Sequence, residues 1–207
     1  VATRAAEEIR RYVTTNAEIL KALAAHLQDT ELTVSQQDRI LKNYILQFHE
    51  FQELTLFDES GAVVATSRIG TPGVEIPKTA ALTVDDVAMS PIHVDADLLP
   101  TALFAVRQKR LNQPSGWLVG QISLEEMWRM VDQIRIGAQG FALVVAPDGQ
   151  LIAHGDPDKK ALVAHSRNMA AHPLIAAARA TPGKPLSLEY TGEEGGHDDL
   201  GVAAPIA

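Results

Sequence analysis

The sequence contains the same β-hairpin signal twice, and this repeat constrains the fold more than any other feature. "LFDESGAVVATS" begins at Leu56, and "VVAPDGQLIAHG" begins at Val144. In each stretch an apolar run, a turn that ends in glycine and a second apolar run are typical of a two-stranded hairpin. The stretches align without a gap at an offset of 88 residues, with Gly61 on Gly149. A repeat at this distance predicts two copies of a domain rather than a short-period solenoid.

Composition excludes several classes of protein. The 207 residues are 46% hydrophobic and 21% charged, which is ordinary for a globular chain. A formal net charge of −8, without a long run of Lys or Arg, argues against a nucleic-acid partner. The absence of cysteine excludes disulfides, thiol catalysis and cysteine-based metal sites. No stretch reaches the roughly 20 apolar residues of a membrane span and no signal peptide begins the chain, so we expect a soluble piece of a longer protein.

The first 29 residues contain no Gly or Pro and predict one long helix. Its apolar residues recur at alternating spacings of three and four, which is a heptad seam with one polar member, Asn16. The seam can pack on the neighbouring domain, or it can also meet its twin in a homodimer with Asn16 near the axis. The seam consists of Ile9, Val13, Asn16, Leu20, Leu23 and Leu27.

The remaining elements follow in the same order in both halves. A second helix is predicted from Ser35, with Asp38 as its capping partner, to about residue 48. The Gly- and Pro-rich segment 68–81 is predicted as a loop, and a capped helix over 123–134 connects the halves. Strands are predicted at about 53–58, 62–67, 90–94, 101–108 and 116–122, and the second half has a hairpin over 140–154, a helix over 169–180, and strands at 186–191 and 200–206.

This order of hairpin, excursion and meander resembles PAS-like sensor units, and two such units after a long helix resemble the double Cache (dCache) family. The resemblance lies in "ELTLFDESGAVVATS" from Glu53 and "GWLVGQISLEEMWRMVDQIRIGAQGFALVVAPDGQLIAH" from Gly116. It implies an α+β fold in which a long N-terminal helix precedes two tandem PAS-like (Cache) units, each an antiparallel sheet flanked by helices. It also implies a signalling helix over 1–29, a membrane-distal unit over 30–135 and a truncated membrane-proximal unit over 136–207.

The resemblance implies the periplasmic or extracellular sensor domain of a bacterial transmembrane receptor, with a sensor histidine kinase as our leading interpretation. A chemoreceptor or a cyclic-dinucleotide enzyme is the alternative output, and a free-standing soluble binding protein or enzyme is the competing class. The sensor fragment itself would not be an enzyme. We expect a small-molecule ligand, a homodimer through the N-terminal helix, no nucleic acid, and a parent chain that spans the membrane.

No catalytic site, metal or cofactor is predicted. His154, Asp156 and Asp158 are of metal-ligating types, but Pro and Gly between them predict a turn with solvated carboxylates. The stretch around His197 has the composition of a hairpin tip, and no serine occurs in a G-x-S-x-G pattern.

The resemblance places the ligand site in the distal unit, between the sheet and the excursion over residues 68–97. Arg68 would suit a carboxylate through a bidentate pair. Phe104 and Val106 point to one face of their strand and Arg107 to the other, so the two sets cannot line the same cavity. Amino-acid-sensing dCache members carry an Arg-x-x-Trp-Tyr type motif here, but residues 68–81 contain neither Trp nor Tyr, so that specificity is not carried over. The predicted ligand-binding residues are Arg68, His93, Asp95, Phe104, Val106 and Trp117.

Overall fold

The chain divides by its internal contacts into two units, which we describe separately. The sheet unit is Val13–Glu125, and the hairpin unit is Val1–Tyr12 with Glu126–Ala207. The structure is a computed structural model that describes residues 1–28, 31–80, 82–94, 99–110, 113–134, 136–137, 140–191 and 198–206.

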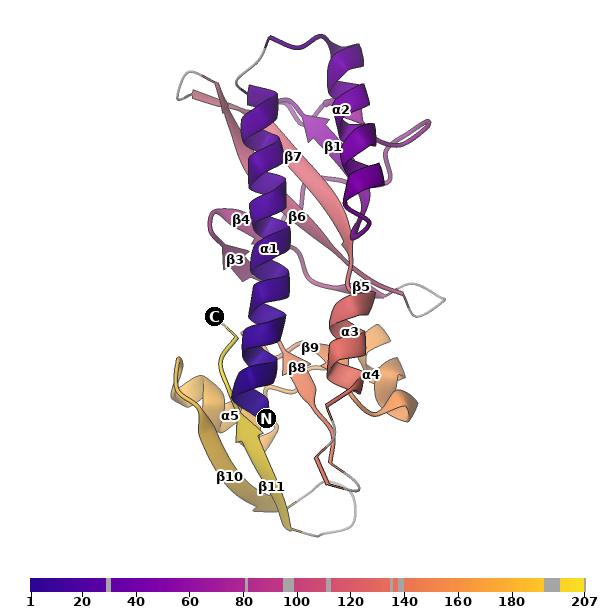
Figure 1. The fold of residues 1–207 in the computed structure, drawn as a ribbon. Helices are drawn as coiled ribbons and strands as arrows, with labels where there is room; N and C mark the ends of the chain where they lie inside the picture. The colour runs from indigo at the N-terminus through magenta and orange to yellow at the C-terminus, as the bar shows by residue number, and fades with distance from the viewer. Residues whose placement is uncertain are drawn as a thin grey trace. The chain divides into compact units, whose positions relative to one another are not determined.

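In the sheet unit one antiparallel sheet has the strand order β2-β1-β7-β6-β4-β3, with β5 paired to β6 (Figure 1). The predicted first hairpin and the two long strands at the end of this unit are confirmed, and both long strands extend beyond their predicted bounds. The strands are β1 (Phe51–Phe57), β2 (Val63–Thr66), β3 (Leu82–Val84), β4 (Val87–Met89), β5 (His93–Val94), β6 (Pro100–Arg110) and β7 (Gln113–Ser123).

The β3–β4 hairpin was not predicted from the sequence. Val84 pairs with Val87, so the turn between them has only two residues, Asp85 and Asp86. Both have positive φ, 47° and 68°, which is the backbone of a type I′ turn. Sequences usually mark that turn with Asn-Gly or Asp-Gly, and Asp-Asp lacks the glycine that makes the signal recognisable.

The long predicted helix is confirmed as α1 (Ala2–Gln28), and its heptad seam is buried within a single chain. All six seam residues are at most 5% exposed, Asn16 included. A homodimer through this seam, with Asn16 on its axis, is therefore wrong, because the surface that it needs already packs inside one molecule. A dimer through α1 would have to use the opposite face, which carries the Arg4–Glu8 ion pair.

The second helix, α2 (Val34–Gln47), begins with a different cap from the one predicted. The Gln36 side chain accepts hydrogen bonds from the backbone N–H of Thr33 at 2.8 Å and from its hydroxyl at 2.9 Å. Asp38 does not cap the helix; its carboxylate accepts the backbone N–H of Thr66 at 2.9 Å. A tertiary contact with β2 has thus taken the carboxylate that local sequence assigned to the cap.

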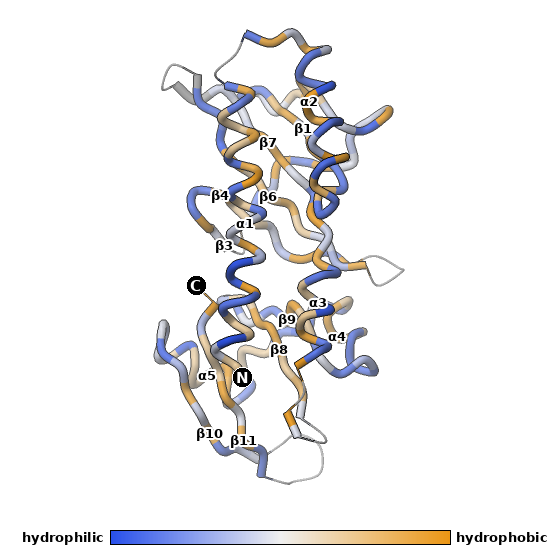
Figure 2. Tube along the Cα trace, viewed as in Figure 1, coloured by the Kyte–Doolittle hydropathy of each residue, from blue (hydrophilic) through white to orange (hydrophobic). Residues whose placement is uncertain are grey.

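The sheet has two faces with different covers. Leu54, Phe104 and Leu118 lie on one face, which we call the helix face; Figure 1 shows α1 and α2 running over the sheet. The opposite face, which we call the loop face, is covered by part of segment 67–80, where Val74 and Ile76 pack on it. Figure 2 shows apolar residues along β1, β6 and β7, as a sheet covered on both faces requires.

The hairpin unit contains two separate two-stranded sheets, β8-β9 and β10-β11. The predicted polar loop after its first hairpin contains a 3-10 turn and a short helix. The predicted second helix begins four residues later than expected, because Pro173 occupies its first turn. The elements are α3 (Glu125–Asp132), β8 (Leu143–Val145), β9 (Leu151–His154), η1 (Pro157–Lys159), α4 (Lys160–Ala164), α5 (Pro173–Ala180), β10 (Leu186–Thr191) and β11 (Asp198–Ala203).

The repeated hairpin is confirmed down to its register. Leu56 pairs with Ala65 in the sheet unit, and Val144 pairs with Ala153 in the hairpin unit, each 88 positions later. In both hairpins a bulge follows this pair immediately, and both turn glycines have positive φ, 83° and 96°. The hairpins belong to different sheets, as a duplicated domain requires.

Candidate functional site

One end of the loop face carries a buried carboxylate that holds the covering loop. Glu53, on β1, is 3% exposed, and both of its carboxylate oxygens accept the backbone N–H of Gly73, at 2.9 and 3.2 Å. The Arg68 guanidinium donates to Oε2 from Nη1 at 3.2 Å, and the Thr55 hydroxyl donates to Oε1 at 3.1 Å. We call these four residues the Glu53 cluster.

Gly73 fits into the Glu53 cluster because it has no side chain. A Cβ at this position would lie 2.4 Å from Arg68 Nη1 and 3.2 Å from Glu53 Oε2. A side chain here would displace the end of the Arg68 side chain from the carboxylate, whereas glycine lets the loop backbone and Arg68 bind it together.

The other end of the loop face is apolar and is covered by the same loop. Val74 packs with Phe57 of β1, Ala105 of β6 and Val119 of β7 in one buried cluster. Partly buried residues complete it, and among them Trp117 lies under the Arg107 guanidinium, which is 4.9 Å from the ring centroid. The partly buried members are Ile76, Leu103 and Trp117.

The strand register fixes the distance between the two ends. Glu53 pairs with Gln121 of β7, and Phe57, four residues later on β1, pairs with Trp117. At about 3.3 Å per residue the two ends are roughly 13 Å apart along the sheet. Thr55 of the Glu53 cluster pairs with Val119 of the apolar cluster, so the two ends adjoin in the middle of the sheet.

The predicted ligand residues are distributed over these surfaces. Arg68 belongs to the Glu53 end, and its side chain is 54% exposed. His93 is exposed on β5, where it pairs with Thr101 of β6 on the same side of the sheet. Trp117 lies at the apolar end.

The remaining predicted residues do not join them. Phe104 and Val106 are buried on the helix face, where they pair with Met89 and Val87 of β4. They are thus separated from Trp117 by the sheet itself, as strand alternation indicated. Asp95 lies outside the described residues.

Glu53 is the residue of this site that sequence reasoning missed. Its position in "FQELTLF" places it on the same face as Thr55 and Phe57, but nothing local shows whether that face is solvated. Only the fold of segment 68–76 over the loop face makes this carboxylate buried, and no signal in the sequence marks that contact.

Replacing Glu53 by alanine is expected to lower the free energy of unfolding by about 1–3 kcal/mol, because Gly73, Arg68 and Thr55 lose the charged acceptor that they share. Glu53→Gln keeps an acceptor oxygen at the same place and removes only the charge, so it should lose less. Urea unfolding of both variants measures the difference. A Glu53→Ala protein as stable as the wild type would show that the cluster does not hold the loop.

The described residues contain neither a metal-binding cluster nor a membrane-spanning helix. There, no group of three or more His, Cys, Asp or Glu side chains is placed to hold a metal ion. Over the same residues, no helix combines the length and apolar character that crossing a bilayer demands.

Several solved structures share this fold. The ligand-binding domain of the Pseudomonas aeruginosa amino-acid chemoreceptor PctC, in complex with GABA, has a TM-score of 0.72 at 18% identity, covering 96% of this chain and 87% of that one. The extracellular domain of mmHK1S-Z3, described as a histidine kinase, has a TM-score of 0.73 at 13% identity, covering 99% and 87%. The ligand-binding domain of the Pseudomonas fluorescens chemoreceptor CtaA, in complex with L-alanine, has a TM-score of 0.66 at 17% identity, covering 96% and 84%. Neither a protein-family model nor a curated protein matches the sequence.

At these identities the similarity establishes the fold. It is the α+β fold of receptor ligand-binding domains, with a long N-terminal helix and an antiparallel sheet, and it agrees with the resemblance to dCache sensor domains. These neighbours are ligand-binding and extracellular domains of receptors rather than catalytic ones.

Proposed function

We propose that this chain is the periplasmic ligand-binding domain of a bacterial transmembrane receptor, and that it binds a small carboxylate at the Glu53 end of the loop face. The observation that carries the proposal is the half-exposed Arg68 guanidinium, which the buried carboxylate of Glu53 holds above the sheet. An arginine has five N–H donors, and the ion pair uses the Nη1 group alone. The remaining donors can form the bidentate pair that a ligand carboxylate prefers.

The apolar end supports the proposal in a different way. Val74 and Ile76 already pack against Phe57 and Trp117. These apolar contacts hold the covering loop on the sheet. A ligand that pairs with Arg68 would lie against the loop from Arg68 to Gly73. If the sheet unit has two conformations, the ligand shifts the balance between them only to the extent that it binds one more tightly than the other.

A thermal-shift screen tests the ligand class. The panel contains γ-aminobutyrate and L-alanine, which are bound in the PctC and CtaA structures, together with short mono- and dicarboxylates and the matching amides. A ligand at 100 times its Kd should add about 2.7 kcal/mol of stability. We expect hits among the carboxylates and none among the amides.

Two variants locate the site. Arg68→Ala should abolish the shift, whereas Arg107→Ala, at the opposite end of the loop face, should leave it unchanged. A shift that survives Arg68→Ala, or that Arg107→Ala removes, would place the ligand elsewhere. Hits among the amides as strong as those among the carboxylates would exclude the proposed ligand class.

We further propose a histidine kinase as the output of the parent chain, and a homodimer through the outward face of α1. Both kinds of receptor, kinase and chemoreceptor, occur among the neighbours, so the fold supports either output. Ligand-dependent phosphorylation of the full-length parent on histidine, with ATP as the donor, tests the kinase. Its absence in a parent that still binds the ligand would favour a chemoreceptor.

A further inference from the structure

The last residue of β9 is a buried histidine with a single defined protonation pattern. His154 is 5% exposed, and its ring stacks on Phe141 with the centroids 4.8 Å apart. Its Nδ1 lies 3.0 Å from the backbone nitrogen of Asp156 and accepts that N–H. An imidazole that accepts at Nδ1 is neutral, with its proton on Nε2.

The sheet unit contains the same hydrogen bond at the equivalent position. Thr66 precedes His154 by 88 residues, and its hydroxyl accepts the backbone N–H of Arg68 at 3.2 Å. A hydroxyl oxygen keeps its acceptor lone pairs at every pH, whereas Nδ1 loses its only one on protonation. Both hairpins thus end with a side chain that accepts the backbone N–H two residues later. Only in the hairpin unit is this acceptor a group that titrates.

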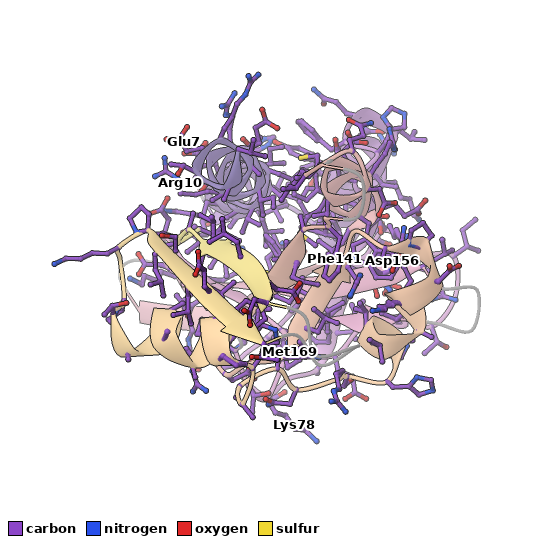
Figure 3. The ribbon with its side chains drawn as sticks, turned by 90° about the horizontal axis from the view of Figure 1, so that it is seen from below. Glu7, Arg10, Lys78, Phe141, Asp156 and Met169 are labelled. Atoms are coloured by element: carbon purple, nitrogen blue, oxygen red, sulfur yellow. The ribbon has the colours of Figure 1, made fainter. Side chains whose placement is uncertain are left out.

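The turn that His154 holds is linked to helix α3 through a side-chain contact. Asp156 begins η1, and its carboxylate accepts the N–H of Asp158 at 3.0 Å. Two residues beyond Asp158, the Lys160 ammonium lies 2.5 Å from a carboxylate oxygen of Asp132, at the end of α3. Figure 3 shows Phe141 and Asp156 close together at the underside of the hairpin unit.

Trp128 on α3 contacts both Lys160 and strand β9. Lys160 Nζ lies 5.2 Å above the ring of Trp128 on α3, and the indole donates to the carbonyl oxygen of Ile152 on β9 at 2.9 Å. The fluorescence of Trp128 should therefore change if the turn at Asp156 or the position of Lys160 changes.

Burial sets the direction in which His154 titrates. Desolvation lowers its pKa from the ordinary value of 6.5, the Lys159 ammonium adds to the lowering, and the Asp156 carboxylate opposes it. Among the described residues, the Asp158 carboxylate lies in the same turn, and the nearby Asp132 and Lys160 are paired with one another. Because the pKa in the folded state is lowered, the neutral imidazole stabilises the unit fully above pH 6.5, and this stabilisation is lost as the pH falls through the folded value.

We propose that His154 is a proton-sensitive switch of the hairpin unit, which holds the turn at Asp156 when neutral and releases it, together with the Lys160–Asp132 contact to α3, when protonated. The stimulus is acid rather than a ligand. The switch would give the receptor a second input that does not depend on the loop face of the sheet unit.

Tryptophan fluorescence tests the switch directly. The chain has two tryptophans, so Trp117→Phe leaves Trp128 as the only emitter. In this background we expect a reversible change of Trp128 emission between about pH 8 and pH 5, with its midpoint below the ordinary histidine value. His154→Thr, which copies the residue found in the sheet unit, should abolish the change. His165→Thr, at an exposed histidine after α4, should leave it intact.

Two further variants test the switch even if His154→Thr fails to fold. Lys159→Gln removes a positive charge and should raise the midpoint, and Asp156→Asn removes a negative charge, keeps a capping oxygen and should lower it. A flat wild-type profile, an unchanged profile in folded His154→Thr, or a midpoint that neither of these two variants moves would overturn the proposal. No ligand is present in these measurements, so their outcome is independent of the proposed ligand site.

Discussion

Replacing Leu20 by glutamate is expected to lower the free energy of unfolding by about 4 kcal/mol or more. Leu20 is fully buried in the middle of α1, so the carboxylate would have to enter an apolar core without a partner. Changes of this size come from few mechanisms, and an unpaired buried charge is one of them. Thermal and urea unfolding of the variant and the wild type measure the loss.

The control for Leu20→Glu lies on the same helix. Ala22 is on the exposed face of α1, so Ala22→Glu should change stability by no more than about 0.5 kcal/mol. Sedimentation of both variants at matched concentration checks that the seam packs inside one chain. If Leu20→Glu unfolds at the wild-type temperature but sediments as a smaller species, the seam joins two chains rather than packing inside one.

Gly116→Ala should be nearly as damaging, because its new methyl group would collide with backbone. A Cβ at this residue, near the beginning of β7, would lie 2.0 Å from the carbonyl oxygen of Phe57 and 2.9 Å from Cα of Asp58. Its φ of +128° is also unfavourable for any residue with a side chain. Since β1 and β7 pair here, we expect a loss of about 3 kcal/mol or more and a loosened contact around Trp117.

Gly70→Ala separates the collision from the backbone conformation. Gly70 also has a positive φ, +98°, but a Cβ there would meet no atom within 4 Å. It should therefore lose only the conformational part, about 1–2 kcal/mol. Urea unfolding, followed by Trp117 fluorescence in a Trp128→Phe background, compares the two, and equal losses would show that the sheet absorbs the collision at Gly116.

The hairpins could be predicted because their signals are local. A glycine at the only turn position with positive φ, between two apolar runs, determines the turn and the pairing beside it. The same chemistry fails for Asp85 and Asp86, which adopt positive φ without glycine. Heptad spacing likewise predicted α1, but spacing does not say what covers the stripe, and the stripe packs within the chain.

The site could be predicted only in part, because some of its features depend on contacts between residues far apart in the sequence. Strand alternation correctly separated Phe104 and Val106 from Arg107, because the direction of a side chain depends on position along the strand. The burial of Glu53 depends instead on Gly73, which is 20 residues away and in a segment without regular structure. The switch histidine was considered only as a metal ligand, since its sequence does not show that its ring is enclosed by Phe141.

The helix α1 has a consequence for how this chain can change in length. Residues up to Tyr12 belong to one unit and residues from Val13 to the other, yet the helix is continuous and both Ile9 and Val13 are buried. One residue inserted between Tyr12 and Val13 would rotate the two buried stripes by about 100° with respect to each other. An insertion of seven residues, nearly two turns of helix, would come within about 20° of restoring the facing of both stripes. The spacing along this helix is therefore set by angle as much as by distance.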